Sequence, residues 1–285
     1  MVQATLNGFL PPDFDPALMP LIDLENPRPS LAPRDFGSIE IDDARSTEEP
    51  GLTEAERFET DGFVLLPHAT RVLDWDKDIA AIYHGEIEAI VRERLYPGVR
   101  VEVQQGPNVL RRGRGTTNDY AGGIHSDGPL TPEDYAVNVA AFAGPQAERW
   151  WIQQFERPEV RGFVQIDFWR TTHMHEPLRH MPLALCRPAS VDAADIVPTR
   201  MIGIAPNRAQ SRHLVLRFNP AQQWVHFPAM TNDEVLAFKL CEFTKDEYGA
   251  RPQNVFHTAF ELPTSEEVEP RQSCEFRVGV LILRD

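Results

Sequence analysis

Short segments in which apolar residues run together or alternate with polar ones, each bounded by turn residues, dominate this chain. Successive side chains on a strand point to opposite faces, so this pattern predicts strands. The segments are Gly62–Thr70, Val99–Leu110, Gly162–Thr172, Arg212–Pro220, Gln222–Pro228 and Cys274–Leu283. Many short strands with few helices must bury their apolar faces against one another. The sequence therefore predicts a mainly β fold with flanking helices, built as one sandwich or barrel core.

Two helices are expected beside these strands. Asp76 is predicted to cap a helix with apolar residues at three- and four-residue spacing, which ends near Leu95. A second is expected to start at Thr131. The residues Thr231–Glu234 resemble a capping box, but the apolar run behind them suits a buried strand equally well, so both interpretations stay open.

The first fifty residues differ in composition from the rest. They hold eight of the 25 prolines, many acidic residues and no sustained periodicity. We expect residues 1–50 to form an extended arm that docks on its own body or bridges a homodimer, and residues 51–285 to form the β domain.

Charge and cysteine content narrow the class of partner. The formal net charge of −15 argues against a nucleic-acid partner. The cysteines Cys186, Cys241 and Cys274 are odd in number and far apart, so a disulfide framework is not expected. We find no signal-peptide pattern and no apolar run of the ~20 residues needed to cross a bilayer. The expectation is a cytoplasmic protein that acts on a small molecule.

The segment "AGGIHSDGPL" contains the first candidate for chemistry. On a strand, His125 and Asp127 would share one face, and an imidazole beside a carboxylate suits a metal. Non-haem iron sites add one more histidine from another strand, and we select His257 in "QNVFHTAFELP". Further along, Arg271 and Ser273 alternate onto one strand face, where a guanidinium and a hydroxyl can bind a dicarboxylate.

With these motifs in order, the chain resembles the Fe(II)/2-oxoglutarate-dependent oxygenases. The particular resemblance is to the hydroxylase/desaturase family that includes the cephem 7-methoxylase component (CmcJ-like) and AsaB-like enzymes. It runs from about Phe58 to Arg277 and is carried by "HSDGPL", "QIDFWRTT", "MPLALCRP", "QQWVHFPAMTNDEVLAFKLCE", "FHTAFELP" and "RQSCEFR". Asp167 and Arg187 depart from the family pattern, which has asparagine and aspartate at those places.

The resemblance implies a double-stranded β-helix, a jelly-roll of two facing sheets. It implies that His125, Asp127 and His257 bind Fe(II), and that Arg271, helped by Ser273, binds 2-oxoglutarate. With O₂ as co-substrate, such an enzyme oxidises an unactivated C–H bond and releases succinate and CO₂. The outcome would be hydroxylation, desaturation or ring formation on a natural-product or amino-acid-derived substrate.

Three alternatives remain open: a cupin-type metal enzyme that does not use 2-oxoglutarate, a zinc-dependent hydrolase or lyase, and a non-catalytic jelly-roll binding module.

Several other residues compete for roles at this site. The candidate substrate contacts are Arg111, Trp169 and Arg170, and Arg170 could equally be a structural ion-pair member. Arg277 shares a strand face with Arg271 and is its rival as the 2-oxoglutarate anchor. The histidines outside the triad are interpreted as loop or packing residues: His173, His175, His180 and His226.

Overall fold

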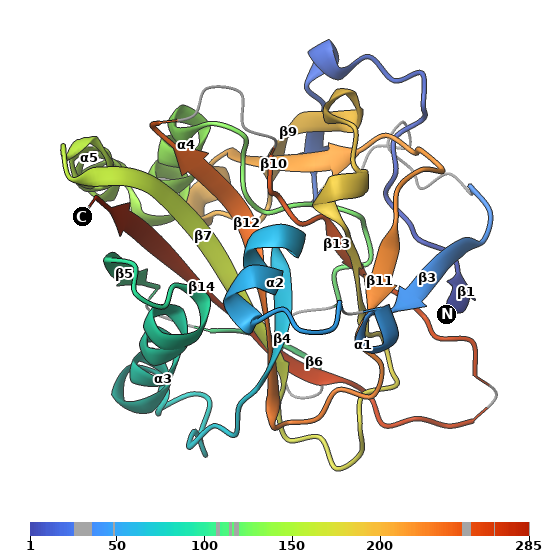
Figure 1. The fold of residues 1–285 in the computed structure, drawn as a ribbon. Helices are drawn as coiled ribbons and strands as arrows, with labels where there is room; N and C mark the ends of the chain where they lie inside the picture. Colours follow the sequence, from blue (N-terminus) through green and yellow to red (C-terminus); the bar gives the residue numbers. More distant parts are fainter. Residues whose placement is uncertain are drawn as a thin grey trace.

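The computed structural model describes residues 1–25, 36–47, 49–106, 109–113, 116, 120–246, 252–264 and 266–284. More of the described residues lie in strands than in helices, and the strands form a large curved sheet and two smaller sheets (Figure 1). The prediction of a mainly β fold with flanking helices is confirmed. Among the described residues, no helix is both long and apolar enough to cross a membrane.

The large sheet is antiparallel and has the order β4-β12-β7-β14-β5, with β6 also paired to β14. Its longest members, β7 and β14, pair along almost their whole lengths, with Ser273 opposite Thr171 and Arg277 opposite Asp167. The strands span β4 (Phe63–Pro67), β5 (Val101–Gln105), β6 (Leu110–Gly113), β7 (Val160–Thr171), β12 (Glu234–Thr244) and β14 (Gln272–Leu283).

Two smaller sheets complete the β structure. One has the order β1-β3-β11-β8-β13 and the other β10-β9-β2. Their strands span β1 (Val2–Ala4), β2 (Leu21–Asp23), β3 (Ile39–Asp43), β8 (Leu183–Cys186), β9 (Ile196–Ile202), β10 (Ser211–Leu216), β11 (Trp224–His226) and β13 (His257–Ala259). Residues 125 and 126 lie between the two sheets: His125 pairs with His257 of β13, and Ser126 pairs with Leu214 of β10.

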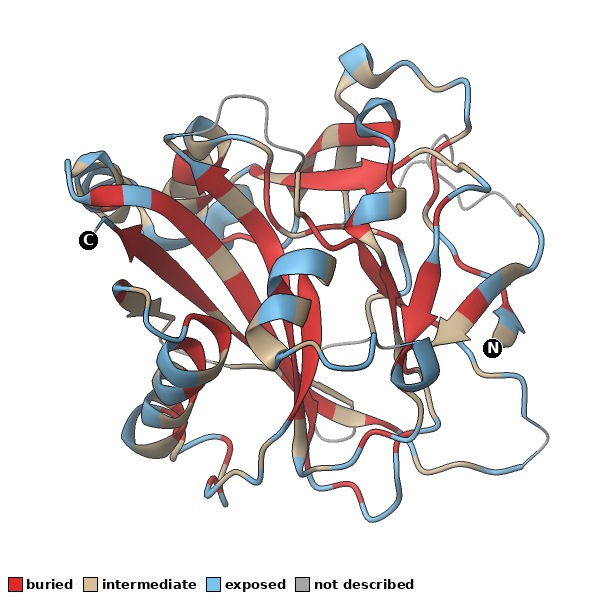
Figure 2. Cartoon of the chain, viewed as in Figure 1, coloured by how far each residue is buried: buried red, intermediate tan, exposed pale blue. Residues whose placement is uncertain are grey.

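The smaller sheets pack on one face of the large sheet. Leu185 and Val225, from a smaller sheet, share a buried cluster with Trp169, Leu236 and Phe238 of the large sheet. Figure 2 shows that the strands of the large sheet are buried along most of their length. Burying this much apolar side-chain area is the main force that holds the two layers together.

Helices cover the outer face and one end of the large sheet. Residues 79–95 form one helix, whose central part is α3 (His84–Ile90), and Ile87 and Ile90 pack on Phe168 and Phe276 of the sheet. The remaining helices are α1 (Ala44–Thr47), α2 (Glu54–Asp61), α4 (Pro132–Ala143) and α5 (Pro145–Glu156). Tyr135 of α4 packs with Trp151 of α5 near the end of β7.

The predicted single strand over Val99–Leu110 is wrong. The chain forms β5 and β6 instead, which pair with β14 in different registers. Gln105 lies opposite Val278, whereas Leu110 lies opposite Glu275. Five residues thus advance the chain by only three positions on its partner, so one continuous strand register cannot include both β5 and β6.

The helix predictions need two corrections. Asp76 does not cap the helix, because Asp78 directly precedes its first residue and Asp76 pairs with Arg111. Thr131 does cap α4, its hydroxyl accepting from the backbone N–H of Asp134, but we had not expected α5 directly behind it. Gly144 separates these two helices with a positive φ of 85°, a conformation that favours glycine.

The residues Thr231–Glu234, which resemble a capping box, form a turn that leads into a strand. The carboxylate of Glu234 accepts from the backbone N–H of Thr231, as in a capping box. Glu234 then begins β12, which is buried along most of its length between β4 and β7. Burial between two strands, rather than local capping, therefore decides the structure of this segment.

The first fifty residues contribute strands to the body of the same chain. β3 pairs in parallel with β11, and β2 pairs in parallel with β9. Phe9 is buried with its ring edge-on to Phe36, Phe218 and Trp224. These contacts make the segment part of the core of the smaller sheets, and its role as a dimer bridge stays a prediction.

Replacing Phe9 with alanine tests this integration. Because Phe9 is buried among three aromatic rings, we expect Phe9→Ala to lower the free energy of unfolding by about 3–5 kcal/mol in a urea titration. The control is Leu18→Ala, whose side chain is largely exposed, and which should change stability by no more than about 0.5 kcal/mol. Equal stability of both variants would show that the arm adds nothing to the core.

Candidate metal centre

Backbone hydrogen bonds bring the two candidate histidine ligands together. The N–H of His125 donates to the carbonyl oxygen of His257 at 3.2 Å, and the N–H of His257 donates back to His125 at 2.9 Å. Residues paired in this way on antiparallel strands place their side chains on the same face. The two imidazole rings accordingly lie with their centroids 4.5 Å apart.

Asp127 is held by the turn that follows it. Gly128 lies against β12 so closely that a Cβ there would collide with the carbonyl oxygen of Leu240. The buried side-chain amide of Asn254 donates to the carbonyl oxygens of Gly128, Pro129 and Leu240, which ties this turn to the strand. The glycine is therefore required by a close backbone approach.

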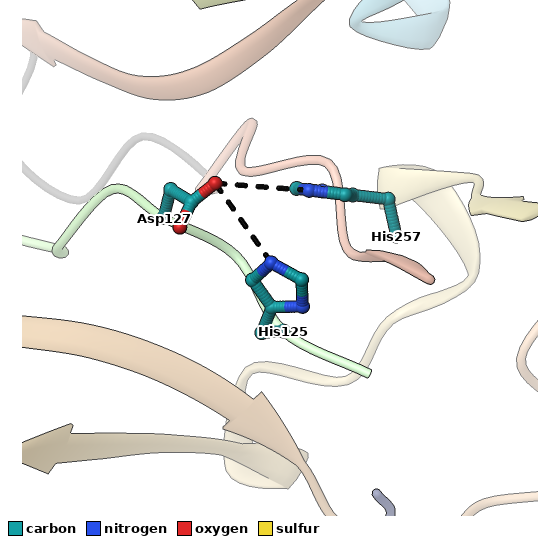
Figure 3. Close-up of side chains that lie close together, drawn as sticks. All are labelled: His125, Asp127 and His257. Carbon is teal, nitrogen blue, oxygen red and sulfur yellow. Dashed lines mark ion pairs between the residues drawn. The ribbon is translucent and has the colours of Figure 1, made fainter. Parts of the chain in front are cut away.

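Figure 3 shows the resulting triad. Oδ2 of Asp127 lies 3.8 Å from Nε2 of His125 and 3.8 Å from Nε2 of His257. One ligand atom from each residue lies within 4.8 Å of the others, a spacing that can hold one metal ion. The structure thus brings together His125, Asp127 and His257, and two imidazoles with one carboxylate form the donor set of non-haem Fe(II) sites.

In each of the two imidazoles, Nδ1 contacts a backbone carbonyl oxygen. Nδ1 of His125 lies 2.6 Å from the carbonyl oxygen of Gly123, and Nδ1 of His257 lies 3.2 Å from that of Val255. Since a carbonyl oxygen only accepts, each Nδ1 carries a hydrogen, which leaves Nε2 as the nitrogen that can bind a metal. Burial, followed by the nearby His125, lowers the pKa of His257 to about 4, so this ring is neutral at physiological pH.

The carboxylate is ionised before any metal binds. Burial would raise the pKa of Asp127, but the Arg277 cation and the neighbouring His125 and His213 hold it well below its usual range. Nη2 of Arg277 donates to Oδ2 at 2.8 Å, and Nδ1 of His213 lies 3.4 Å from Oδ1. Asp127 and His257 are therefore in the protonation state that a metal requires.

A cavity begins at the two imidazoles and extends into the space between the sheets. It is lined by Arg112, Ala121, His125, Trp169, Leu183, Phe238, His257, Arg271 and Glu275. Ala121, Leu183, Trp169 and Phe238 give it apolar walls. Two arginines and one glutamate supply its charges, and Nε of Arg112 pairs with Oε1 of Glu275 at 2.7 Å.

Arg271 is a buried cation held between two aromatic rings. Its guanidinium carbon lies 4.3 Å from the ring centroid of Tyr120 and 5.5 Å from that of Trp169. Nη1 donates to the carbonyl oxygen of Met181, whereas Nε has no hydrogen-bond partner among the described residues. Burial lowers the pKa of Arg271 to about 10, which still leaves it charged at neutral pH.

The hydroxyl of Ser273 lies on the same strand face and also lacks a partner in the described part of the chain. Buried donors without partners are costly. The Arg271 guanidinium and the Ser273 hydroxyl therefore fit an anionic group that would accept from both.

The three candidate substrate contacts lie in different places. Trp169 lines the cavity. Arg111 lies on the surface and pairs with Asp76 at 3.0 Å. Arg170 follows Trp169 on the strand and so points to the opposite face, where it is buried against Trp75 and donates to the carbonyl oxygens of His68 and Asn232. Arg111 and Arg170 are therefore outside the cavity of the triad.

Four of the remaining histidines are separate from the triad, whereas Nδ1 of His213 lies 3.4 Å from Oδ1 of Asp127. His173 and His175 are exposed, in the loop after β7. The ring of His180 packs edge-on against Tyr120, and its Nδ1 accepts a hydrogen bond from the backbone N–H of Arg271. His226 is buried against the edge of Phe260.

Sequence reasoning missed Arg112, Glu275, Asn254 and Tyr120. Arg112 and Glu275 carried a usable signal, because alternation along β6 and β14 places them on the face that also bears Arg271. Asn254 and Tyr120 lie outside regular strands, so no periodicity marks them.

A family model described as an oxidoreductase/YMDC permease-like domain matches residues 25–281. The chain belongs to this family. The match covers nearly all of the chain, including every residue of the triad. No curated protein matches the chain.

Solved structures show the same fold. The iron and alpha-ketoglutarate-dependent endoperoxidase NvfI aligns with a TM-score of 0.71 and 18% identity, over 99% of this chain and 98% of that one. A variant of that enzyme, in which one tryptophan is replaced by phenylalanine, aligns with a TM-score of 0.73 and 19% identity, over 99% and 97%. At this identity the likeness establishes the fold.

Removing one imidazole tests the metal centre. We expect His257→Ala to weaken Co(II) binding by more than about 100-fold, since losing a ligand should cost more than the 10–100-fold typical of its supporting contacts. Isothermal titration calorimetry of metal-free protein measures this. His175→Ala, at an exposed histidine in the loop after β7, is the control and should bind like the original protein. Equal binding by both variants would show that His257 is no ligand.

Proposed function

We propose that the protein is a non-haem Fe(II)/2-oxoglutarate-dependent oxygenase. The observation that carries the proposal is one cavity lined both by the triad imidazoles and by a buried arginine with an unused N–H. The triad supplies the donor set for Fe(II), and Arg271 with Ser273 supplies the donors for a carboxylate. The iron and alpha-ketoglutarate dependence of NvfI, which has the same fold, supports this assignment.

Bound Fe(II) with 2-oxoglutarate and O₂ would supply the oxidising chemistry, with release of succinate and CO₂. The residues of the chain bind and orient. Tyr120 and Trp169 both contact the guanidinium of Arg271, so it is positioned before the dicarboxylate arrives. The apolar walls formed by Leu183 and Phe238 exclude water from the cavity.

We also propose that the fold is a double-stranded β-helix. The order β6-β14-β7-β12 in the large sheet faces the order formed by residues 125–126, β13, β8 and β11. These segments alternate between the two layers along the chain, except for β8 and β11, which pair within the smaller layer, and this arrangement is that of a jelly-roll. The metal ligands then lie on two neighbouring strands of the smaller layer.

The proposal extends to the substrate and the reaction outcome, and to the family, cellular location and oligomeric state of the protein. Apolar residues beside the imidazoles favour a C–H bond of a small natural-product or amino-acid-derived substrate, which would be hydroxylated, desaturated or cyclised. Membership of the hydroxylase/desaturase AsaB-like and CmcJ-like family, a cytoplasmic location and a homodimer through the N-terminal arm stay predictions.

The decisive experiment is an anaerobic titration of the metal-free protein with Fe(II) and 2-oxoglutarate. We expect a visible charge-transfer band that needs both components, followed by succinate release when O₂ is admitted. Turnover without 2-oxoglutarate would favour a cupin-type enzyme. A featureless spectrum without turnover would favour a binding module.

Variants at Arg271 test the cofactor site separately. Losing one partner of a buried charge pair costs about 2–5 kcal/mol, so we expect Arg271→Met to raise the KM for 2-oxoglutarate by roughly 30-fold or more. Ser273→Ala removes one hydrogen bond and should raise it about tenfold. Both should keep the Co(II) affinity of the original protein, and a loss of metal binding would place Arg271 in a different role.

A further inference from the structure

Arg277 contacts three carboxylates at once. From β14, its Nη2 lies 2.8 Å from Oδ2 of Asp127 and 3.3 Å from Oε2 of Glu275, and its Nε lies 3.5 Å from Oδ2 of Asp167. The contact with Asp167 is a direct cross-strand pair between β14 and β7. The other two contacts come from the ligand turn and from the same strand.

The oxygen that Arg277 holds is the one that faces both imidazoles. Oδ2 of Asp127 is the atom 3.8 Å from Nε2 of His125 and of His257, whereas Oδ1 faces His213. A metal bound between the two imidazoles and this carboxylate would need the same oxygen. The guanidinium and the metal would therefore bind the same oxygen atom, and their positive charges would repel each other.

The carboxylates around Arg277 depend on it for charge balance. Both side-chain oxygens of the buried Asp167 lack a hydrogen-bond partner among the residues described, so its ion pair with Arg277 is the contact that offsets its charge. Asp127 is anionic and nearly buried as well. Without a nearby cation, like charges this close would repel strongly.

We propose, resting on the metal site of the proposed function, that Arg277 is a placeholder cation. It is a positioning residue that holds Asp127 in the ligand orientation while no metal is present and yields Oδ2 when a divalent ion arrives. Asp167 and Glu275 then retain the guanidinium. Since 32% of the Arg277 side chain is exposed, it has room to make this shift.

This role predicts that losing Arg277 strengthens metal binding. Arg277→Met removes a competing and repelling positive charge and should tighten Co(II) binding about tenfold, within the range of typical coupling between two ligands. The same variant should melt at a lower temperature without metal, because Asp127 and Asp167 lose the cation beside them, whereas Glu275 keeps its ion pair with Arg112. Calorimetric titration with Co(II) at about pH 8 and thermal unfolding measure the two effects.

Matched variants separate charge from structure. Arg277→Lys keeps the positive charge and should remain within about threefold of the original affinity. Arg92→Met removes the same charge from a helix surface, where Arg92 pairs with Glu88, and should have no effect. Asp167→Asn removes an alternative partner of Arg277 and one negative charge, so it should weaken Co(II) binding by about threefold or more.

Unchanged or weaker Co(II) binding by Arg277→Met would overturn the placeholder role. If Arg277→Met does not fold without metal, the Asp167→Asn variant alone tests the placeholder role. Unchanged or tighter Co(II) binding by Asp167→Asn would then overturn that role. A failure of the metal site itself is distinct: in that case the original protein would not bind Co(II), or His257→Ala would bind it equally well.

Discussion

The reciprocal backbone hydrogen bonds between His125 and His257 are the constraint on which the site depends. They join two segments that lie 132 positions apart in the sequence, and they insert residues 125 and 126 between the two smaller sheets. Antiparallel pairing alone is then sufficient to place both imidazoles on one face. Asp127 follows two residues later and is fixed by the Gly128 turn against β12. The geometry of the candidate metal centre is therefore a consequence of strand register, which loops alone would specify far less precisely.

Charge compensation organises the space next to this centre. Arg277, Arg112 and Arg271 face Asp127, Asp167 and Glu275 within one region between the sheets, so buried charges of both signs are balanced. Burial raises the pKa of Asp167 to about 7, which shows how much its charge costs even beside Arg277. Arg271 differs from the other two arginines, because it is held by aromatic rings and a carbonyl oxygen and keeps an unused donor. That difference favours Arg271 over Arg277 as the group that receives an anionic cofactor.

The alternation of apolar and polar residues and the capping residues predicted those regular elements that bury the same face along their whole length. The strands β7 and β14 and the N-terminal cap of α4 lie where alternation and Thr131 placed them. The prediction failed where tertiary pairing overrides the local pattern. Alternation continues through Val99–Leu110, but β14 accepts that stretch only as two strands in different registers. Likewise, the capping-box residues Thr231–Glu234 precede a strand, because β4 and β7 bury it from both sides.

The sequence by itself determined which side chains are available for chemistry: an imidazole and a carboxylate two residues apart, a distant histidine, and an arginine beside a serine on one strand face. Residue type and strand periodicity are local properties, so they can be derived without coordinates. Only the tertiary structure decided that Arg170 and Arg111 lie outside the cavity, that Arg277 pairs with the carboxylate of Asp127, and that Arg112 and Glu275 line the cavity beside the two imidazoles. Those outcomes depend on which strands become neighbours and in which register, and the non-local burial of apolar surface sets both.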